Sequence, residues 1–361
     1  MAENPLKEKS VAALGFLEKM VQAGFDPLFK GGTCAQIFIP EGLQRLSIDL
    51  DIATNESEAR VFETLEAIKA RTPIDTERWK DTPDPNLPFV RYTITLDPQG
   101  KRTSFYLDVL FKEPSYATQQ TALHTRYFDS GTKARTPTLH SILGDKLATL
   151  GPKTVGRKLE NERHAVDYLK HVYDISQLLP LASNTALVFG AYRAVVNDQK
   201  TFRPKVHITT ENSLEDLLDV AKWLTMTAQN PKEVRDITTA GKVELLKAGI
   251  DGISAYLTPG VHFGPNEARS AGGQIALVAK TLERESKGKN HHSFAVLRDE
   301  SERMFKKEDF IKSAAKRLAF EEPEIEWQRL VATSPKAIAY WHAALFPEHA
   351  EVTSEYRKKY G

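Results

Sequence analysis

Residues 46–53 read LSIDLDIA, in which apolar and polar side chains alternate strictly. Because successive side chains of a strand point to opposite faces, this alternation predicts a β-strand. The two faces would carry Ile48, Leu50 and Ile52 on one side and Ser47, Asp49 and Asp51 on the other. Two carboxylates that project together from a rigid element are what a divalent metal ion needs. The stretch therefore predicts a strand that presents Asp49 and Asp51 to a metal.

A glycine turn comes before this strand. Gly31, Gly32 and Thr33 follow a short extended segment, and the apolar residues 34–39 come next, which predicts strand, turn and short helix. Glycines let the backbone approach a polyphosphate closely, and amides at a helix start favour anions. We expect this turn to bind a triphosphate, with the Thr33 hydroxyl as an added ligand. Lys30 and Arg45 would neutralise its charge, unless each is a surface residue whose stem covers apolar area.

A third acid follows on a later strand. The β-like runs 89–96 and 104–111 flank a turn at 98–100 and predict a hairpin. Asp108 lies inside the second run, where an isolated charge is costly to bury without a partner or a cation. A neighbouring strand would bring it to the metals held by Asp49 and Asp51. Nucleotidyl transfer uses two divalent ions, so the pattern predicts a nucleotidyltransferase site with two Mg²⁺ ions and an NTP as substrate.

The rest of the chain has mainly helical periodicity. Helices are predicted at 6–24, 56–71, 138–150, 161–179, 185–198, 213–228, 231–257, 265–285, 303–319 and 334–345. This is an α+β pattern, with a nucleotidyltransferase-like domain and a small mixed sheet at 1–135. A helical domain at 136–210 would complete the active-site cleft, and a C-terminal helical domain would occupy 211–361.

The composition excludes several classes of protein. A net charge of +1 over 361 residues gives no overall attraction to nucleic acid or membrane. The single cysteine, Cys34, excludes an intrachain disulfide and fits a reducing cytosol. No run of eighteen apolar residues occurs, and the P-loop, zincin and dinucleotide-binding motifs are absent. We expect a cytoplasmic protein without a membrane partner.

The stretches 30–33 (KGGT) and 45–51 (RLSIDLD) together resemble the signature of AbiEii/AbiGii-type, MenT-like nucleotidyltransferase toxins. Two later stretches, 143–148 (LGDKLA) and 170–175 (KHVYDI), resemble two helical motifs of this family, K-L-x-A-L and K-D-x-Y-D-L. The resemblance covers roughly residues 25–180. It implies functional roles for Ser47, Asp49, Lys146 and Asp174. Lys146 would contact phosphates, and Asp174 would act as a base or a positioning group.

The chain departs from the family pattern in two places. His171 stands where the family usually has an acid, and the stretch 151–162 separates the last two motifs more widely than usual. Asp167 competes with Asp174, because residues seven apart lie on nearly the same helical face. Without the resemblance, Lys146, Asp167 and Asp174 would be interpreted as surface charges of helices.

The resemblance implies a reaction and partners. The chain would transfer NMP from an NTP to the 3′ end of tRNA, as the toxin of a type IV-like toxin–antitoxin pair with a cognate antitoxin. One alternative is a nucleotidyltransferase that modifies a protein side chain or a small molecule. Another is a degenerate, non-enzymatic fold that acts as a binding or antitoxin-like partner.

Overall fold

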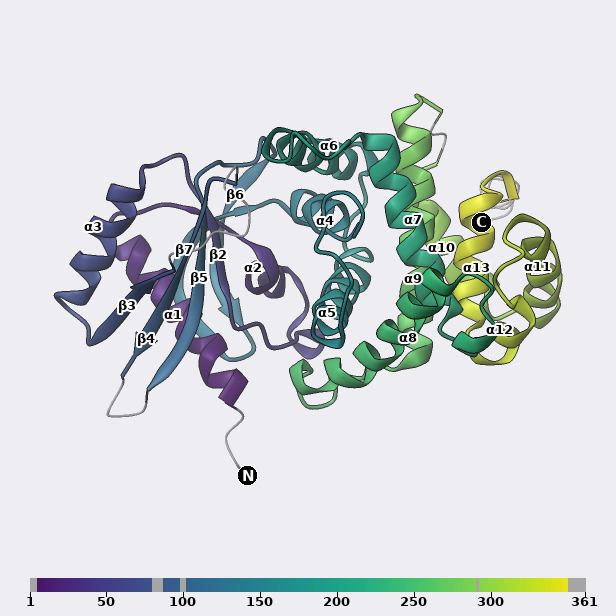
Figure 1. The fold of residues 1–361 in the computed structure, drawn as a ribbon, viewed down its shortest axis with the longest axis horizontal. Helices are drawn as coiled ribbons and strands as arrows, with labels where there is room; N and C mark the ends of the chain where they lie inside the picture. The colour runs from purple at the N-terminus through teal and green to yellow at the C-terminus, as the bar shows by residue number, and fades with distance from the viewer. Residues whose placement is uncertain (1–4, 80–86, 98–101, 290–291, 350–361) are drawn as a thin grey trace. The chain divides into compact units, whose positions relative to one another are not determined.

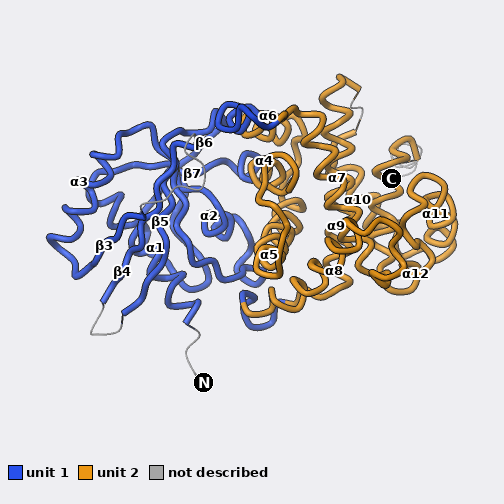
Figure 2. The backbone as a smooth tube through the Cα atoms, in the orientation of Figure 1, with its two compact units in different colours: residues 1–142, 197–206, 256–261 blue, residues 143–196, 207–255, 262–361 orange. Residues whose placement is uncertain are grey.

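The computed structural model describes residues 5–79, 87–97, 102–289 and 292–349. The chain forms two compact units, each assembled from segments that are distant in sequence (Figure 2). Unit 1 comprises residues 1–142, 197–206 and 256–261, and unit 2 comprises residues 143–196, 207–255 and 262–361. This division differs from the expected three domains with boundaries after residues 135 and 210, because the chain returns twice to unit 1.

Unit 1 is built on a five-stranded mixed sheet (Figure 1). The strand order is β1-β2-β5-β4-β3, with β2 and β5 parallel and the other neighbours antiparallel. The strands are β1 (Leu28–Lys30), β2 (Leu50–Ala53), β3 (Ile74–Arg78), β4 (Phe89–Leu96) and β5 (Thr103–Leu110). The α+β class, the small mixed sheet and the pairing of β4 with β5 confirm the predictions, while the predicted turn at 98–100 lies outside the described residues.

One face of the sheet belongs to the core of unit 1. Tyr92 of β4 and Phe105 of β5 are buried on this face. Helix α1 (Pro5–Gln22) packs here, and the rings of Phe16 and Phe105 meet edge to face with centroids 5.7 Å apart. Helix α3 (Glu58–Lys69) lies on the same side, because its first residue accepts a hydrogen bond from the Tyr92 hydroxyl at 3.3 Å. The alternate residues of β4 and β5 form a second face that is partly exposed.

The D-x-D strand is shorter than predicted. It begins at Leu50, and the four residues before it are not part of a strand. Arg45 instead forms an isolated bridge with Leu257, and the Leu46 amide donates a hydrogen bond to the Tyr256 carbonyl at 2.7 Å. The backbone of this segment therefore pairs with residues 256–257, which are more than 200 residues later in the chain. The local alternation of side chains cannot indicate such a partner.

Three further strands were not predicted. The edge strand β3 is one, and the others are β6 (Thr118–Thr125) and β7 (Phe128–Pro137), which form a separate two-stranded sheet. The sequence of β6, TQQTALHT, has few apolar residues, and the pairing of β6 with β7 is irregular between Ala122 and His124. A strand of this composition gives only a weak period-two signal.

The chain after β7 is helical, as expected. The α-helices there are α4 (Leu139–Ala148), α5 (Glu162–Leu178), α6 (Thr185–Phe202), α7 (Thr210–Met226), α8 (Ile237–Gly252), α9 (Pro265–Ser286), α10 (Phe294–Met304), α11 (Glu308–Glu321), α12 (Trp327–Thr333) and α13 (Pro335–Leu345). Helices α10 and α12 were missed, and short 3-10 turns flank α8 where one longer helix was expected. The core of unit 2 lies where α7, α9 and α13 pack together.

Two glycines with the same backbone conformation offer a test of packing at the start of helix α2 (Gly31–Phe38). Gly31 has φ 79° and Gly24 has φ 78°, in the left-handed region. A Cβ at Gly31 would lie 1.9 Å from Oδ2 of Asp51, whereas a Cβ at Gly24 would meet nothing within 4 Å. We expect Gly24→Ala to lower the free energy of unfolding by about 1–2 kcal/mol through backbone strain.

Gly31→Ala should lower the free energy of unfolding by clearly more than Gly24→Ala, because the Asp51 carboxylate must also move. Urea denaturation of the two variants measures the difference. Equal losses in the two variants would contradict the close approach of Asp51 to Gly31.

Candidate active site

Four charged residues lie in one row across the partly exposed face of the sheet. The strand register places Lys30 opposite Asp51, and Asp51 opposite Asp108. It also places Asp108 opposite Arg91. Neighbouring strands are about 4.8 Å apart, and residues directly opposite each other point to the same face. The register thus sets Asp108 beside Asp51, in line with the expectation that a neighbouring strand carries the third acid to the pair.

Asp108 is held by an arginine that the sequence analysis did not single out. Arg91 donates from Nε to Oδ1 and from Nη2 to Oδ2 of Asp108, both at 2.6 Å. Hydrogen bonding to Asp108 raises the pKa of Arg91 above its ordinary value, and the negative charges of Asp49 and Asp51 add to this rise. Both carboxylates are therefore within electrostatic reach of the Arg91 guanidinium.

Each oxygen of Asp108 accepts one hydrogen bond from Arg91 and keeps a second lone pair, so the ion pair does not by itself prevent metal binding by Asp108. In the described ranges of the chain, no three or more His, Cys, Asp and Glu side chains are grouped so that they could hold a metal ion. The role of Asp108 as a third metal ligand stays a prediction. Its observed role is to orient Arg91 in a bidentate ion pair.

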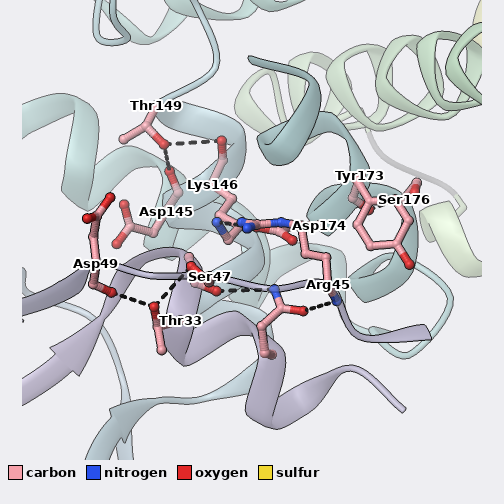
Figure 3. Close-up of polar contacts among 12 residues, drawn as sticks. Thr33, Arg45, Ser47, Asp49, Asp145, Lys146, Thr149, Tyr173, Asp174 and Ser176 are labelled. Atoms are coloured by element: carbon pink, nitrogen blue, oxygen red, sulfur yellow. Dashed lines mark hydrogen bonds and ion pairs between the residues drawn. The ribbon is translucent and has the colours of Figure 1, made fainter. Parts of the chain in front are cut away.

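The hydroxyl of Thr33 fastens the glycine turn to the D-x-D segment (Figure 3). It donates a hydrogen bond to the backbone carbonyl of Asp49 and lies 3.0 Å from the hydroxyl of Ser47. Thr33 is 1% exposed and Ser47 is 8% exposed. Both were expected to bind a nucleotide. In the structure, the two hydroxyls contact each other, and that of Thr33 also contacts the backbone that carries Asp49. Nucleotide binding by Thr33 and Ser47 stays a prediction.

Arg45 lies against the glycine turn. It is 5% exposed, so its interpretation as a surface residue is wrong. Its backbone amide donates to Oε1 of Gln36 at 2.8 Å, and its Nη1 donates to the carbonyl of Leu46 at 3.0 Å. A Cβ on Gly32 would lie 3.0 Å from Nη2 of Arg45. The guanidinium therefore lies beside Gly32, in the turn that was expected to bind the triphosphate.

Gln36 and Gln44 are buried polar residues that the sequence analysis passed over. The Gln36 amide group donates to the carbonyl of Gly32 at 3.2 Å, and the Gln44 amide group donates to the carbonyl of Gln36 at 2.8 Å. The Thr258 hydroxyl in turn donates to the carbonyl of Gln44 at 2.8 Å. A single glutamine four residues after Gly32 on an otherwise apolar helix was the one local signal of this network.

The start of α2 and its neighbouring acids fit a magnesium–nucleotide complex. Lys30 is the N-cap residue, and its own side chain makes no capping hydrogen bond. The first amides of a helix favour anions, and the carboxylate of Asp51 lies beside Gly31. Mg²⁺ is commonly held by one or two carboxylates together with substrate phosphates and water. Asp49 and Asp51 would supply the carboxylates of such a site.

In unit 2, the motif helices α4 and α5 contribute a buried ion pair (Figure 3). Nζ of Lys146 lies 2.8 Å from Oδ2 of Asp174, and the two side chains are 4% and 0% exposed. Their interpretation as surface charges is therefore wrong. A buried charge is stable only with its partner in place, so Asp174 fixes the position of the Lys146 ammonium.

Asp167 has a different environment from Asp174. Its side chain is 33% exposed and pairs with Arg157 at 2.9 Å and with Lys170 at 2.7 Å. Loss of one partner from such a partly exposed pair costs less stability than loss of one partner from a fully buried pair. Asp174, and not Asp167, is the acid of α5 that contacts Lys146.

The mixed sheet, the glycine turn and the carboxylates of β2 and its neighbour define a nucleotidyltransferase-like domain. The family model of the nucleotidyl transferase AbiEii toxin of type IV toxin–antitoxin systems matches residues 16–245. The chain therefore belongs to this family, which confirms the resemblance read from its motifs.

JHP933 and MenT4 are among the solved structures that are similar to this chain. JHP933 from Helicobacter pylori is 16% identical, with a TM-score of 0.42 over 80% of this chain and 97% of its own. MenT4, a nucleotidyltransferase toxin from Mycobacterium tuberculosis, is 14% identical, with a TM-score of 0.40 over 68% of this chain and 85% of its own. No curated protein matches the chain. Among the described helices, none is long and apolar enough to cross a membrane.

The buried ion pair makes a prediction about stability. Lys146→Met removes the ammonium that lies 2.8 Å from the buried Asp174 carboxylate, so we expect the free energy of unfolding to fall by about 3–5 kcal/mol. The double variant Lys146→Met/Asp174→Leu buries no charge and should recover most of that loss. Denaturant unfolding followed by circular dichroism measures both, with Asp167→Ala as the exposed control. A double variant that is no more stable than the single one would contradict the ion pair.

Proposed function

We propose that this chain transfers a nucleoside monophosphate from an NTP to the 3′ end of tRNA and acts as the toxin of a toxin–antitoxin pair in the cytoplasm. The observation that carries the proposal is the contact of one glycine turn with both acids of the D-x-D segment. Thr33 bonds to the backbone of Asp49, and Gly31 leaves room for the carboxylate of Asp51. Family membership supports the transferase and the toxin class.

Different residues around the turn would contact different parts of the NTP. Gly31 and Gly32 let the backbone approach the triphosphate, and Lys30 and Arg45 balance its negative charge. Asp49 and Asp51 would hold Mg²⁺, with two ions expected. When bound, Mg²⁺ stabilises the negative charge that develops on the α-phosphate oxygens during transfer.

In the proposed reaction, a 3′-hydroxyl oxygen of the acceptor attacks the α-phosphorus and forms a new P–O bond. The bond from the α-phosphorus to the bridging oxygen breaks, pyrophosphate leaves, and the hydroxyl proton is released to solvent. Lys146 is proposed to contact the phosphates. Asp174 is fully buried against Lys146, so we assign it a positioning role rather than that of a base.

Two alternatives lead to different products. A protein side chain or a small molecule would serve equally well as the nucleophile, because the described site sets no requirement on the acceptor. A degenerate fold that only binds a partner would make no product. The closely packed turn, acids and cations favour an enzyme over the degenerate fold, and the cognate antitoxin remains a proposed partner.

The test is to incubate the protein with Mg²⁺, total tRNA and each α-labelled NTP in turn, and to separate RNA from protein on a gel. We expect label on RNA with the wild type. Asp49→Ala should lower the labelling rate by about 100-fold or more, because several kcal/mol of charge stabilisation depend on the metal. The Asp49 backbone carbonyl that accepts the Thr33 bond is unchanged in this variant, so the fold should persist.

The matched control is Asp75→Ala, which removes an exposed acid from β3 and should label RNA like the wild type. Label on protein would favour the first alternative. Absence of label on any acceptor, or full labelling by Asp49→Ala, would sink the proposed reaction.

A further inference from the structure

The row of charged residues continues across the sheet into aromatic side chains that the proposed reaction does not use. The Arg91 guanidinium carbon lies 4.8 Å from the ring centroid of Tyr106, 5.5 Å from that of Trp79 and 6.0 Å from that of Phe89. We call these four residues, Trp79, Phe89, Arg91 and Tyr106, the aromatic platform.

The platform lies on the same face of the sheet as Asp51 and Asp108. The Trp79 amide donates to the Arg91 carbonyl at 2.9 Å, which extends the row by one position beyond β4. Phe89 is two residues from Arg91, and Tyr106 is two residues from Asp108, so their side chains point to the same side. Trp79 is 42% exposed. The side chain of Arg91 is 29% exposed.

Contacts within the protein hold the side chains of the platform in place. Nε1 of Trp79 donates to the Thr93 hydroxyl at 2.9 Å, and its ring meets Tyr106 edge to face with centroids 5.5 Å apart. Both oxygens of Asp108 bind the guanidinium of Arg91. A surface that is already ordered loses little conformational entropy when it binds. A tryptophan fixed this way but left partly in water is typical of a binding surface rather than of a core.

The chemistry of the platform fits unpaired nucleobases. Aromatic rings on an open sheet and arginine planes stack on the faces of single-stranded bases, with little dependence on sequence. The charge of Arg91 is balanced by Asp108, so the platform offers stacking surface rather than excess positive charge. It is therefore suited to the faces of bases more than to phosphates.

The position of Arg91 in the row favours stacking of a base of the acceptor over the base of the NTP. The glycine turn follows β1, and Asp51 of β2 and Asp108 of β5 lie between it and Arg91 of β4 in the row. In nucleotidyl transfer, the attacking oxygen and the leaving pyrophosphate lie in line on opposite sides of the α-phosphorus. With the triphosphate at the glycine turn, the acceptor approaches from the side of β4, and Arg91 lies about 10 Å across the sheet from Asp51, two strand spacings away.

We infer that the aromatic platform binds the unpaired bases at the 3′ end of the acceptor RNA by stacking. The inference rests on the proposed function, because that function places the triphosphate at the glycine turn. It adds a site for the acceptor and names Trp79 as its main contact.

The test measures binding and needs no catalysis. Two fluorescent RNA hairpins are titrated with protein, one with an unpaired 3′ tail and one with the same tail made abasic. The wild type should bind the tail with bases about 10-fold more tightly, within the range for stacking of a base on an aromatic side chain. Trp79→Ala should lose this preference, and Trp79→Phe should keep most of it.

The matched control is Phe62→Ala, which removes a 56% exposed aromatic ring from α3, on the other side of the sheet. This variant should bind both hairpins like the wild type. Trp79→Ala should also leave the salt dependence of binding unchanged, because no phosphate contact is removed.

The binding and transfer experiments together separate the platform from the proposed reaction. Equal affinity of the wild type for both hairpins would overturn the platform. A Trp79→Ala variant with weaker NTP binding and unchanged RNA binding would assign the stacked base to the NTP and overturn the acceptor site. Base-dependent RNA binding without nucleotidyl transfer would support the platform and refute the proposed reaction. Nucleotidyl transfer with equal binding of both tails would support the proposed reaction and refute the platform.

Discussion

The site depends on the close approach of the Asp51 carboxylate to the backbone of Gly31. That approach requires a residue without a Cβ, in a left-handed conformation, at the first position of α2. It brings the start of the helix, where anions are favoured, within reach of the acids of the D-x-D segment. The Thr33 hydroxyl then fixes the same turn to the Asp49 carbonyl. A nucleotide and its metal would share this junction.

The order of charges along the row explains how two acids are tolerated side by side. Asp51 and Asp108 lie opposite each other on β2 and β5, and like charges at such positions repel. Lys30 on one side and Arg91 on the other give each carboxylate a cationic neighbour. Arg91 in turn holds its aromatic neighbours around one guanidinium. The same ion pair thereby contributes both to charge balance at the acids and to the shape of the surface beside them.

Local sequence patterns predicted the glycine turn, the pair of acids and the hairpin that carries Asp108, because each of these depends on neighbours in the sequence. The partner of Asp108 could not be predicted in this way. A turn centred on Gln99 would place Val90 opposite Asp108, and the observed register, shifted by one residue, places Arg91 there. The bridge between Arg45 and Leu257 was equally hidden, since no local pattern identifies a partner so distant in the chain. The charges of Lys146 and Asp174 fit an exposed helix equally well. Only the family motifs singled these two residues out as functional, and no pattern in the sequence indicated that they pair.

We propose that one junction, formed by the glycine turn and the D-x-D segment, binds both the metal and the triphosphate. A crystal structure of the protein with Mn²⁺ and a non-hydrolysable NTP analogue tests it most directly, because the anomalous signal of manganese locates the ion. We expect manganese at the carboxylates of Asp49 and Asp51, with the triphosphate against the backbone of Gly31 and Gly32. Manganese bound elsewhere, or a triphosphate away from the glycine turn, would contradict it.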